Sequence, residues 1–253
     1  MTIRVSAVIP AFNEERYLPR LLASVEIARR RYRGGPESVE VVVADNGSTD
    51  GTIRIAQANG CVITAVEPRV IAAVRNGGAR AARGSILAFV DADAEVHPDT
   101  FNAIEDFFAD GTRIVGASGV LLERRSWGIN VTWLVLVVLT RLLRFDTGVI
   151  CCRKEDWEAV GGYREHWRFA EDVWFLEDLK RLGRTRGQSF GRLSGVPSVF
   201  STRKFDEHGE WHYMLLVFAK FPLWLLFSRG SIGKYVERYW YGRQRAHSPP
   251  GSG

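Results

Sequence analysis

The chain has 253 residues, 46% of them hydrophobic, and a formal net charge of +5. A chain of this length and composition can bury a full core, which excludes a small scaffold that depends on disulfides or zinc. The mild basic charge suits anionic partners such as nucleotides or anionic lipids, but without a basic motif interleaved with aromatics it predicts no nucleic-acid partner.

The first predicted strand ends at Pro10, and Asn13 then offers the cap of a helix. Apolar residues follow with helical spacing at Leu18, Leu21, Leu22, Val25 and Ala28. Because proline is tolerated only in the first turn of a helix, Pro19 predicts that the regular helix begins near Tyr17. No signal peptide precedes the strand, so we expect a protein of the cytoplasm.

The cysteines, Cys61, Cys151 and Cys152, have neither the number nor the spacing of a disulfide framework or a zinc site. Since adjacent strand residues point to opposite faces, we expect Cys151 and Cys152 to pack in the core or close to it. Free thiols also fit a reducing compartment.

Three further strands are predicted in the first half of the chain, each followed by polar residues. They run from Val39 to Ala44, from Cys61 to Val66 and from Ser85 to Val90. An Ala-rich helix is expected between the last two, from Ile71 to Arg83. Continuously apolar strands that alternate with helices are typical of a parallel sheet covered on both faces. We therefore predict an α/β fold that binds its ligand at the carboxyl ends of the strands.

Two aspartates follow the fourth of these strands. Alternation along an extended chain would put Asp91 and Asp93 on the same side, with Ala92 opposite. Crowded carboxylates favour a cation, and a hard divalent ion with oxygen ligands suits them. The pair predicts a site for a metal-bound phosphate, although a solvated acidic turn would show the same pattern.

In the second half, a strand is expected near residues 114–122, and residues 126–140 then form an apolar stretch without charge. It is shorter than the roughly 18 apolar residues of a spanning helix, so it is either a core helix or a helix in a membrane interface. A second apolar stretch, residues 213–227, precedes an aromatic and basic segment, residues 234–243. These stretches predict peripheral attachment to the inner face of the cell membrane, with burial in a homo-oligomer as the alternative.

Two polar segments late in the chain are candidates for catalysis or ligand binding. Glu171 and Asp172 begin a predicted helix, where the helix dipole alone would favour carboxylates. Arg203 and Lys204 lie in a polar loop beyond the last expected strand. We expect this loop to close over a diphosphate, with one of its cations offsetting the charge of the leaving group.

Four segments carry a family resemblance: VIPAFNEERYLPRLLASV, VVVADNGSTDGT, VRNGGARAARGSILAFVDADAEVHPD and VGGYREHWRFAEDVWFLEDLKRLG. In this order and spacing they resemble a family 2 glycosyltransferase of the GT-A fold, over residues 3–205. The resemblance implies a Rossmann-like, mostly parallel sheet with helices on both faces. It also implies the inverting transfer of a sugar from a nucleotide-diphosphate donor with Mg²⁺ or Mn²⁺.

The same resemblance implies roles for residues on the donor side. Pro10, Phe12 and Glu14 would shape the nucleoside pocket. Asp45 would receive polar groups of the base or ribose, and Arg75 would contact the nucleotide. Many members have two aspartates in the second segment where this chain has a single one, so both UDP-linked and GDP-linked donors stay open.

Further roles concern the metal and the acceptor. Asp91 would hold the ribose or a metal-bound water, Asp93 would ligate the metal, and His208 would be a third ligand. Asp172 would be the catalytic base, and Glu171 would face the acceptor. The resemblance leaves the acceptor open between a sugar or lipid-linked hydroxyl and a polyprenyl phosphate, in the synthesis of glycolipid, polysaccharide or cell-envelope glycan.

These patterns predict one GT-A domain over residues 1–205, with a nucleotide-binding half over about 1–95 and an acceptor half over about 96–205. Apolar or amphipathic C-terminal helices are expected over 206–245, with a disordered tail over 246–253. One alternative function is that of a GT-A-like nucleotidyltransferase, but the glycine-rich, lysine-containing loop of that class is absent after Ile9. The other alternative is a non-catalytic protein that binds nucleotide sugars.

Overall fold

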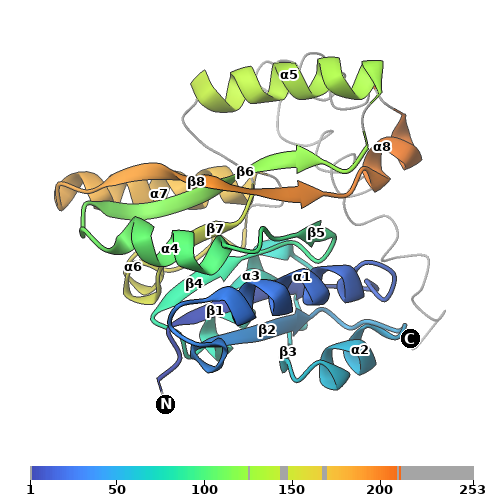
Figure 1. Ribbon diagram of the computed structural model, residues 1–253, viewed down its shortest axis with the longest axis horizontal. Helices are drawn as coiled ribbons and strands as arrows, with labels where there is room; N and C mark the ends of the chain where they lie inside the picture. Colours follow the sequence, from blue (N-terminus) through green and yellow to red (C-terminus); the bar gives the residue numbers. More distant parts are fainter. Residues whose placement is uncertain (1, 125, 143–147, 167–169, 210, 212–253) are drawn as a thin grey trace.

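A computed structural model describes residues 2–124, 126–142, 148–166, 170–209 and 211 (Figure 1). The predicted apolar stretch at 213–227, the aromatic and basic segment at 234–243 and the tail at 246–253 lie outside these residues. The described residues of the predicted C-terminal region contribute only the end of one short helix.

The described residues form one eight-stranded sheet in the order β3-β2-β1-β4-β7-β6-β8-β5. Its strands are β1 (Val5–Ala11), β2 (Val39–Asp45), β3 (Val62–Ala65), β4 (Ile86–Phe89), β5 (Ala94–Glu95), β6 (Arg113–Leu122), β7 (Ile150–Arg153) and β8 (Ser189–Phe200). The helices are α1 (Leu18–Arg31), the 3-10 helix η1 (Pro36–Ser38), α2 (Thr52–Ala58), α3 (Ile71–Ala81), α4 (Thr100–Phe108), α5 (Trp127–Leu142), α6 (Lys154–Ala159), α7 (Glu171–Thr185) and α8 (Arg203–His208).

The sheet is mostly parallel, as predicted. Strands β1 to β4 are mutually parallel, and β6 pairs in parallel with β8. Strand β7 runs antiparallel between β4 and β6, and the short β5 runs antiparallel at the edge beside β8. Parallel pairing brings the carboxyl ends of β1, β2 and β4 to one edge of the sheet. This is the edge at which the polar residues after each strand predicted ligand binding.

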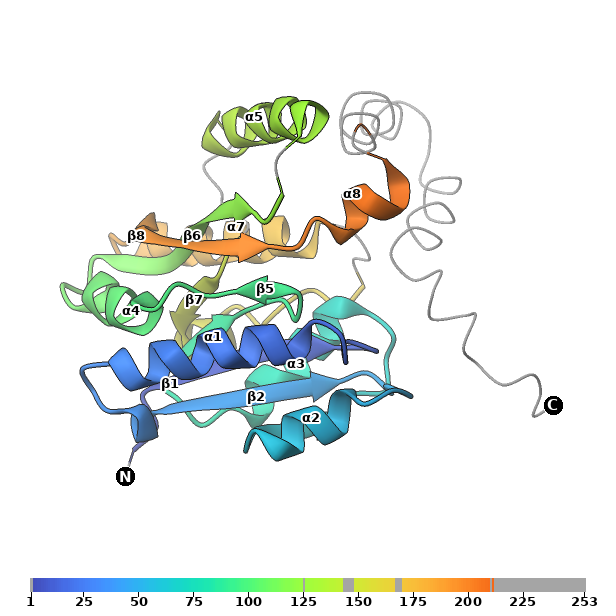
Figure 2. The ribbon, with the colours of Figure 1, turned by 45° about the vertical axis from the view of Figure 1, so that its right-hand side comes forward.

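Strands β1, β2 and β4 bury both of their faces, which explains their continuous apolar runs. On one face, Val5, Ala7 and Ile9 of β1 pack in a core with α1 and α4. On the other face, Val8 and Val42 belong to a second core with α3 and α7. Figure 2 shows these helix pairs on opposite sides of the sheet. The predicted arrangement with helices on both faces is confirmed.

Helix α5 is placed differently from the other helices. Figures 1 and 2 both show it set beyond the β6–β8 part of the sheet rather than laid on a face. It buries Ile129 and Thr132 but exposes Trp127, Leu134 and Val138, at 76%, 64% and 49% of their surface. Among the described residues, no helix is long and apolar enough to cross a membrane.

The cysteines follow the prediction. Cys151 and Cys152 lie in β7 and are fully buried, and Cys61 is half-buried; all three are free thiols. Burial raises the pKa of Cys151 to about 12, so this thiol packs as an apolar group and stays protonated.

Two local predictions are wrong. Asn13 does not cap α1, because the cap position is Tyr17 and Asn13 adopts a left-handed conformation with φ of 53°. Its Oδ1 instead accepts the Thr49 N–H at 2.7 Å, and asparagine tolerates this backbone better than most residues. Asp91 to Asp93 are not extended either. They form a turn closed by the Ala94 N–H and the Asp91 carbonyl at 3.1 Å, because the chain reverses from β4 into β5.

The opposite, amino edge of the sheet is joined by a buried polar cluster. Ser6 Oγ donates to Glu40 Oε1 at 2.6 Å, Arg83 Nε donates to Glu40 Oε2 at 2.8 Å, and the Gly84 N–H donates to Ser6 Oγ at 2.8 Å. Burial opposes the charge of Glu40, but the hydrogen bonds from Ser6 and Arg83 outweigh it and lower the pKa of this carboxyl. The cluster ties the starts of β1, β2 and β4 together.

We expect Glu40→Gln to lower the free energy of unfolding at pH 7 by about 2 kcal/mol, since hydrogen bonds to a charged group are lost. A lowered folded-state pKa means that the contribution is present above the unfolded pKa and is lost as pH falls through the folded pKa. The difference between wild type and variant should therefore shrink below about pH 4. Urea unfolding at pH 7 and pH 3 measures this, with the exposed Glu37→Gln as control. An equal difference at both pH values would contradict it.

Candidate active site

The candidate site lies at the carboxyl edge of the sheet, where segments from both halves of the chain meet. Strands β1 and β2 end together, with Ala11 in register with Asp45. Strand β8 returns to the same place, because the Ser201 N–H donates to the Asp93 carbonyl at 3.2 Å. This bond brings Arg203, at the start of α8, beside the turn after β4.

Backbone N–H groups after β1 donate to hydroxyl oxygens that follow β2. The Asn13 N–H donates to Ser48 Oγ at 2.9 Å, and the Glu14 N–H donates to Thr52 Oγ1 at 2.8 Å. Asp45, only 3% exposed, accepts the N–H groups of Gly47 and Ser48 at 3.0 and 3.1 Å. Asp45 thus shapes its own loop, and a contact from it to base or ribose stays a prediction, like the nucleoside pocket of Pro10 and Phe12.

Arg75 of α3 lies at the centre of a carboxylate cluster. Its Nη1 donates to Glu171 Oε1 at 2.9 Å and to Asp172 Oδ1 at 2.6 Å. Its Nη2 donates to Asp91 Oδ1 at 2.8 Å. The side chain is only 7% exposed, so the guanidinium lies beneath the carboxylates. The predicted contact of Arg75 with a nucleotide stays a prediction. In the structure, the guanidinium of Arg75 donates hydrogen bonds to acidic side chains.

Tyr163 supports this guanidinium, a role that the sequence analysis missed. The Arg75 guanidinium carbon lies 5.4 Å from the centre of the Tyr163 ring, which also stacks on Phe175 at 4.0 Å. The side-chain amide of Asn76 holds the Tyr163 backbone, donating to its carbonyl and accepting its N–H, both at 2.8 Å. The signal was present in the third and fourth segments of the resemblance, where Arg75-Asn76 and Tyr163 stand.

The surroundings of Asp172 change its acidity. Burial raises the pKa of this carboxyl, Arg75 opposes the rise, and the charges of Glu171 and Asp91 add to it, with a result of about 7. A carboxyl with a pKa near the working pH is suited to accept and release a proton. Among the described residues, this cluster is the best candidate for acid–base chemistry.

A second arginine holds two further acidic residues of the edge. Arg203 donates to both oxygens of Glu14, through Nη1 at 2.7 Å and Nη2 at 3.0 Å. Its Nε lies 2.9 Å from Asp93 Oδ2, and its guanidinium carbon lies 4.9 Å from the centre of the Tyr17 ring. Burial raises the pKa of Glu14, the bond from Arg203 opposes the rise, and Asp93 adds to it. The structure therefore brings together three of the predicted ligand-binding residues.

The donor set at this edge fits a divalent ion that shares its ligands with a phosphate. The described residues contain no group of three or more His, Cys, Asp or Glu that could enclose a metal. Mg²⁺, however, is usually held by one or two carboxylates, with substrate phosphates and water as the other ligands. Asp91 and Asp93 supply such a pair. His208 and Lys204 belong to α8, but their side chains lie outside the described part of the structure.

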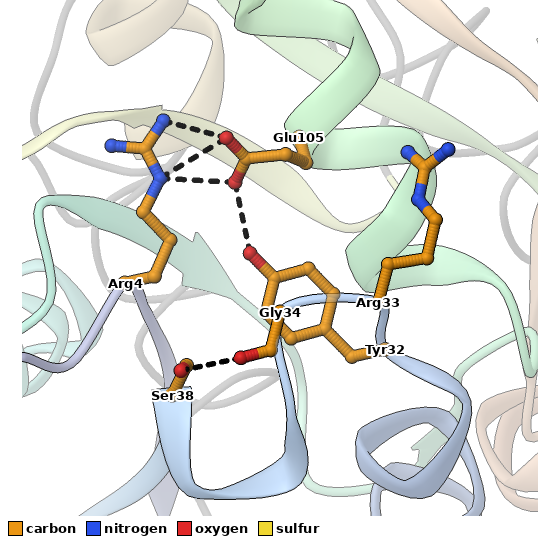
Figure 3. A pocket seen from close by; sticks show the side chains of 6 residues that line it. All are labelled: Arg4, Tyr32, Arg33, Gly34, Ser38 and Glu105. Atoms are coloured by element: carbon orange, nitrogen blue, oxygen red, sulfur yellow. Dashed lines mark hydrogen bonds and ion pairs between the residues drawn. The ribbon is translucent and has the colours of Figure 1, made fainter. Parts of the chain in front are cut away.

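A pocket of about 360 Å³ lies elsewhere, at the amino ends of β1 and β2 (Figure 3). There Glu105 accepts hydrogen bonds from Arg4 Nε and from the Tyr32 hydroxyl, both at 2.9 Å. Burial and the bond to Glu105 raise the pKa of Tyr32 to about 12, so its hydroxyl stays a donor. Because Arg4, Tyr32 and Glu105 satisfy one another, the pocket is a weaker ligand site than the carboxyl edge.

Backbone strain precedes the acidic pair. Ala170, directly before Glu171, adopts a left-handed conformation with φ of 56°. For alanine this conformation costs roughly 1–2 kcal/mol, and such strain often lies at functional sites. It turns the chain into α7 so that Glu171 and Asp172 both reach Arg75.

Comparison with known proteins relates the chain to transferases. The family described as "Glycosyl transferase family 2" matches residues 6–146, more than half of the chain. An undecaprenyl-phosphate 4-deoxy-4-formamido-L-arabinose transferase of Pseudomonas paraeruginosa is 34% identical over 125 residues, 45% of this chain and 34% of that protein. The validoxylamine A glucosyltransferase of Streptomyces hygroscopicus subsp. limoneus is 33% identical over 113 residues, 40% of this chain and 22% of that protein. The matches thus span about a third or less of these relatives.

Solved structures share the fold. TarS 1-349 of S. aureus aligns with a TM-score of 0.63 and 17% identity, covering 97% of this chain and 73% of TarS. The glucosyl-3-phosphoglycerate synthase of Mycobacterium tuberculosis, solved with Mn²⁺ and UDP-glucose, aligns with a TM-score of 0.59 and 22% identity, covering 82% and 74%. These likenesses confirm the predicted GT-A-type fold.

Ala170→Gly should raise the free energy of unfolding by about 1 kcal/mol, because glycine adopts a positive φ without strain. Ala23→Gly, at an exposed position within α1, is the matched control and should lower it by about 1 kcal/mol. Urea unfolding of the three proteins at pH 7 makes the comparison. A loss of stability in both variants would show that Ala170 carries no strain.

Proposed function

Because the chain belongs to glycosyl transferase family 2, we propose that it moves a sugar from a nucleotide-diphosphate donor to an acceptor, with inversion at the anomeric carbon. The observation that carries the proposal is the Arg75 cluster, which joins Asp172 to Asp91 through one guanidinium. A proton acceptor is thereby held beside a carboxylate of the predicted donor site. A non-catalytic sugar-nucleotide binder would have no need of that arrangement.

In the proposed reaction, Asp172 accepts the proton of an acceptor hydroxyl. The acceptor oxygen attacks the anomeric carbon, and the bond from that carbon to the diphosphate breaks on the opposite side. Arg75 holds Asp172 at Oδ1 and fixes its orientation, which is a positioning role. With a pKa near 7, Asp172 is ionised in a large fraction of molecules at neutral pH and still basic enough to take the proton.

The charge balance of the edge supports the use of a divalent ion. Five carboxylates, those of Glu14, Asp91, Asp93, Glu171 and Asp172, surround two arginines. This excess of negative charge would repel an anionic diphosphate without an intervening cation. Asp91 and Asp93 would hold Mg²⁺ or Mn²⁺, which when bound stabilises charge on the departing nucleotide. The synthase of M. tuberculosis was solved with Mn²⁺ and UDP.

Donor and acceptor are proposed by chemical class. The relative from P. paraeruginosa is named an undecaprenyl-phosphate 4-deoxy-4-formamido-L-arabinose transferase, and TarS was solved with UDP-GlcNAc and with UDP. We therefore take UDP as the first nucleotide to test, and both hydroxyl and polyprenyl phosphate acceptors. The two acceptors differ in one physical respect: a phosphate monoester has a second pKa of about 6, so at neutral pH it needs no base.

We further propose that the protein attaches peripherally to a membrane surface through α5. The exposed side chains of Trp127, Leu134 and Val138 fall on one side of a helix that has no charge between residues 126 and 140. A helix that is too short to span and exposes a tryptophan and aliphatic side chains suits the interface of a bilayer. Such an attachment would bring the protein to the surface that holds a lipid-linked acceptor.

The function is tested through Asp172→Asn. With a hydroxyl acceptor, kcat should fall by about 10² to 10⁴ while UDP affinity stays unchanged, because the base acts in the transition state and hardly in donor binding. The rise of wild-type kcat/KM through about pH 7 should disappear in the variant. With a phosphate acceptor, the loss should be below about tenfold.

The control for this test is Asp178→Asn on the same helix, where Asp178 pairs with Arg164 at 2.8 Å. It should keep both kcat and the pH profile. Normal transfer to a hydroxyl by Asp172→Asn would assign the base elsewhere, with Glu171 the first candidate. Loss of UDP binding in the same variant would show that Asp172 has a structural role.

Membrane attachment is tested by flotation with vesicles of phosphatidylcholine and phosphatidylglycerol. The wild type should float at low salt and less so at high salt, because screening weakens the attraction of its cations. Trp127→Ser combined with Leu134→Ser should reduce flotation about tenfold or more, since apolar area is lost. Ile27→Ser, at a residue of α1 that is 52% exposed, should leave it unchanged. A wild type that stays at the bottom at low salt would favour the homo-oligomer interface.

A further inference from the structure

Two arginines neutralise the two aspartates of the turn after β4, and they differ in access. Arg75 holds Asp91 from beneath, with 7% of its side chain exposed and bonds to two further carboxylates. Arg203 holds Asp93, with 23% of its side chain exposed, and comes from α8 near the end of the described residues. Only the second arginine can leave its aspartate without breaking up the catalytic cluster.

Arg203 and a divalent ion would compete for the same negative charge. The Arg203 Nε lies 2.9 Å from Asp93 Oδ2, within direct ion-pair distance. A metal ion ligated by Asp93 would lie close to that guanidinium, and two such cations repel each other strongly in a partly buried site. Binding of the metal ion therefore requires Arg203 to move away from Asp93.

The site also offers other anionic partners to an Arg203 that has left Asp93. Glu14 holds the guanidinium by a two-point contact at 2.7 and 3.0 Å, which keeps Arg203 at the edge when the bond to Asp93 is lost. A diphosphate bound to the metal would offer oxygens to the same planar group, and arginine binds phosphate oxygens with two parallel hydrogen bonds. The guanidinium would exchange one anion for another with a small movement.

We propose that Arg203 is an exchangeable counter-ion of Asp93, which a divalent ion displaces and which then binds the donor diphosphate. This inference rests on the proposed function and adds that the binding of the metal ion and the binding of the nucleotide depend on each other. The metal alone binds weakly, because it must separate Arg203 from Asp93 without compensation. The diphosphate restores a partner to Arg203, so the metal and the nucleotide strengthen each other's binding by the same factor.

The experiment measures Mn²⁺ affinity by calorimetry and by the electron paramagnetic resonance of free Mn²⁺, with and without UDP. Arg203→Met should bind Mn²⁺ alone about tenfold or more tightly than the wild type, since a close competing charge is gone. The same variant should bind UDP at saturating Mn²⁺ about tenfold or more weakly, because the diphosphate loses its arginine. The two affinities thus move in opposite directions, which general damage to the site cannot produce.

Two further variants separate this effect from net charge and from folding. Arg54→Met removes an exposed arginine of α2, the helix that follows the loop after β2, so it makes the same change in charge near the edge. It should change both affinities by less than about twofold. Arg203→Lys keeps a cation at the position, so it should keep the weak binding of Mn²⁺ alone, and it tests the proposal if Arg203→Met does not fold.

The proposal is overturned if Arg203→Met binds Mn²⁺ alone no more tightly than the wild type. It is overturned as well if Arg203→Lys binds Mn²⁺ alone about tenfold or more tightly than the wild type. It is also overturned if Arg54→Met reproduces the tightening. Asp93→Ala should abolish the tightening in the Arg203→Met background, which identifies the carboxylate that the two cations share. Failure of the proposed function is seen separately, as absence of sugar transfer by a wild type whose Mn²⁺ and UDP affinities follow the pattern above.

Discussion

A buried guanidinium beneath three carboxylates is the interaction on which the site depends. Asp91, Glu171 and Asp172 come from a turn after β4 and from the start of α7, and Arg75 comes from α3. Carboxylates that are withdrawn from water are costly unless they are paired. One arginine bonds to all three, and it thereby sets the distance between the turn after β4 and the start of α7.

The fold provides a rigid position for this arginine. Helix α3 packs in the core beneath β1 and β2, so that the backbone of Arg75 is fixed by apolar contacts. Tyr163 and Asn76 then hold the guanidinium and the loop beside it. The left-handed Ala170 brings Glu171 and Asp172 to the same point. The packing of α3, the contacts of Tyr163 and Asn76 and the left-handed backbone of Ala170 therefore all fix the position of the hydrogen-bonded Arg75 cluster.

The two arginines of the edge differ in their own access to solvent, because 7% of the Arg75 side chain and 23% of the Arg203 side chain are exposed. Arg75 is enclosed by three carboxylates and the Tyr163 ring, whereas Arg203 comes from a short helix near the end of the described residues. A polar site that must admit a charged ligand needs both kinds of counter-ion. One maintains the geometry, and the other can be exchanged when a ligand brings its own charge.

The sequence by itself determined the alternating strands and helices of the first half, the mostly parallel sheet and its polar edge, because apolar periodicity and strand-end residues are local signals. It also identified Asp91, Asp93, Asp172 and Arg203 as candidates. Only the tertiary structure decided that Arg75 meets Asp172 across 97 residues and that Arg203 meets Glu14 across 189. It also decided the turn at Asp91 to Asp93 and the exposed side of α5. Ion pairs between distant segments leave no periodic trace along the chain, because they depend on how the packed elements bring loop ends together.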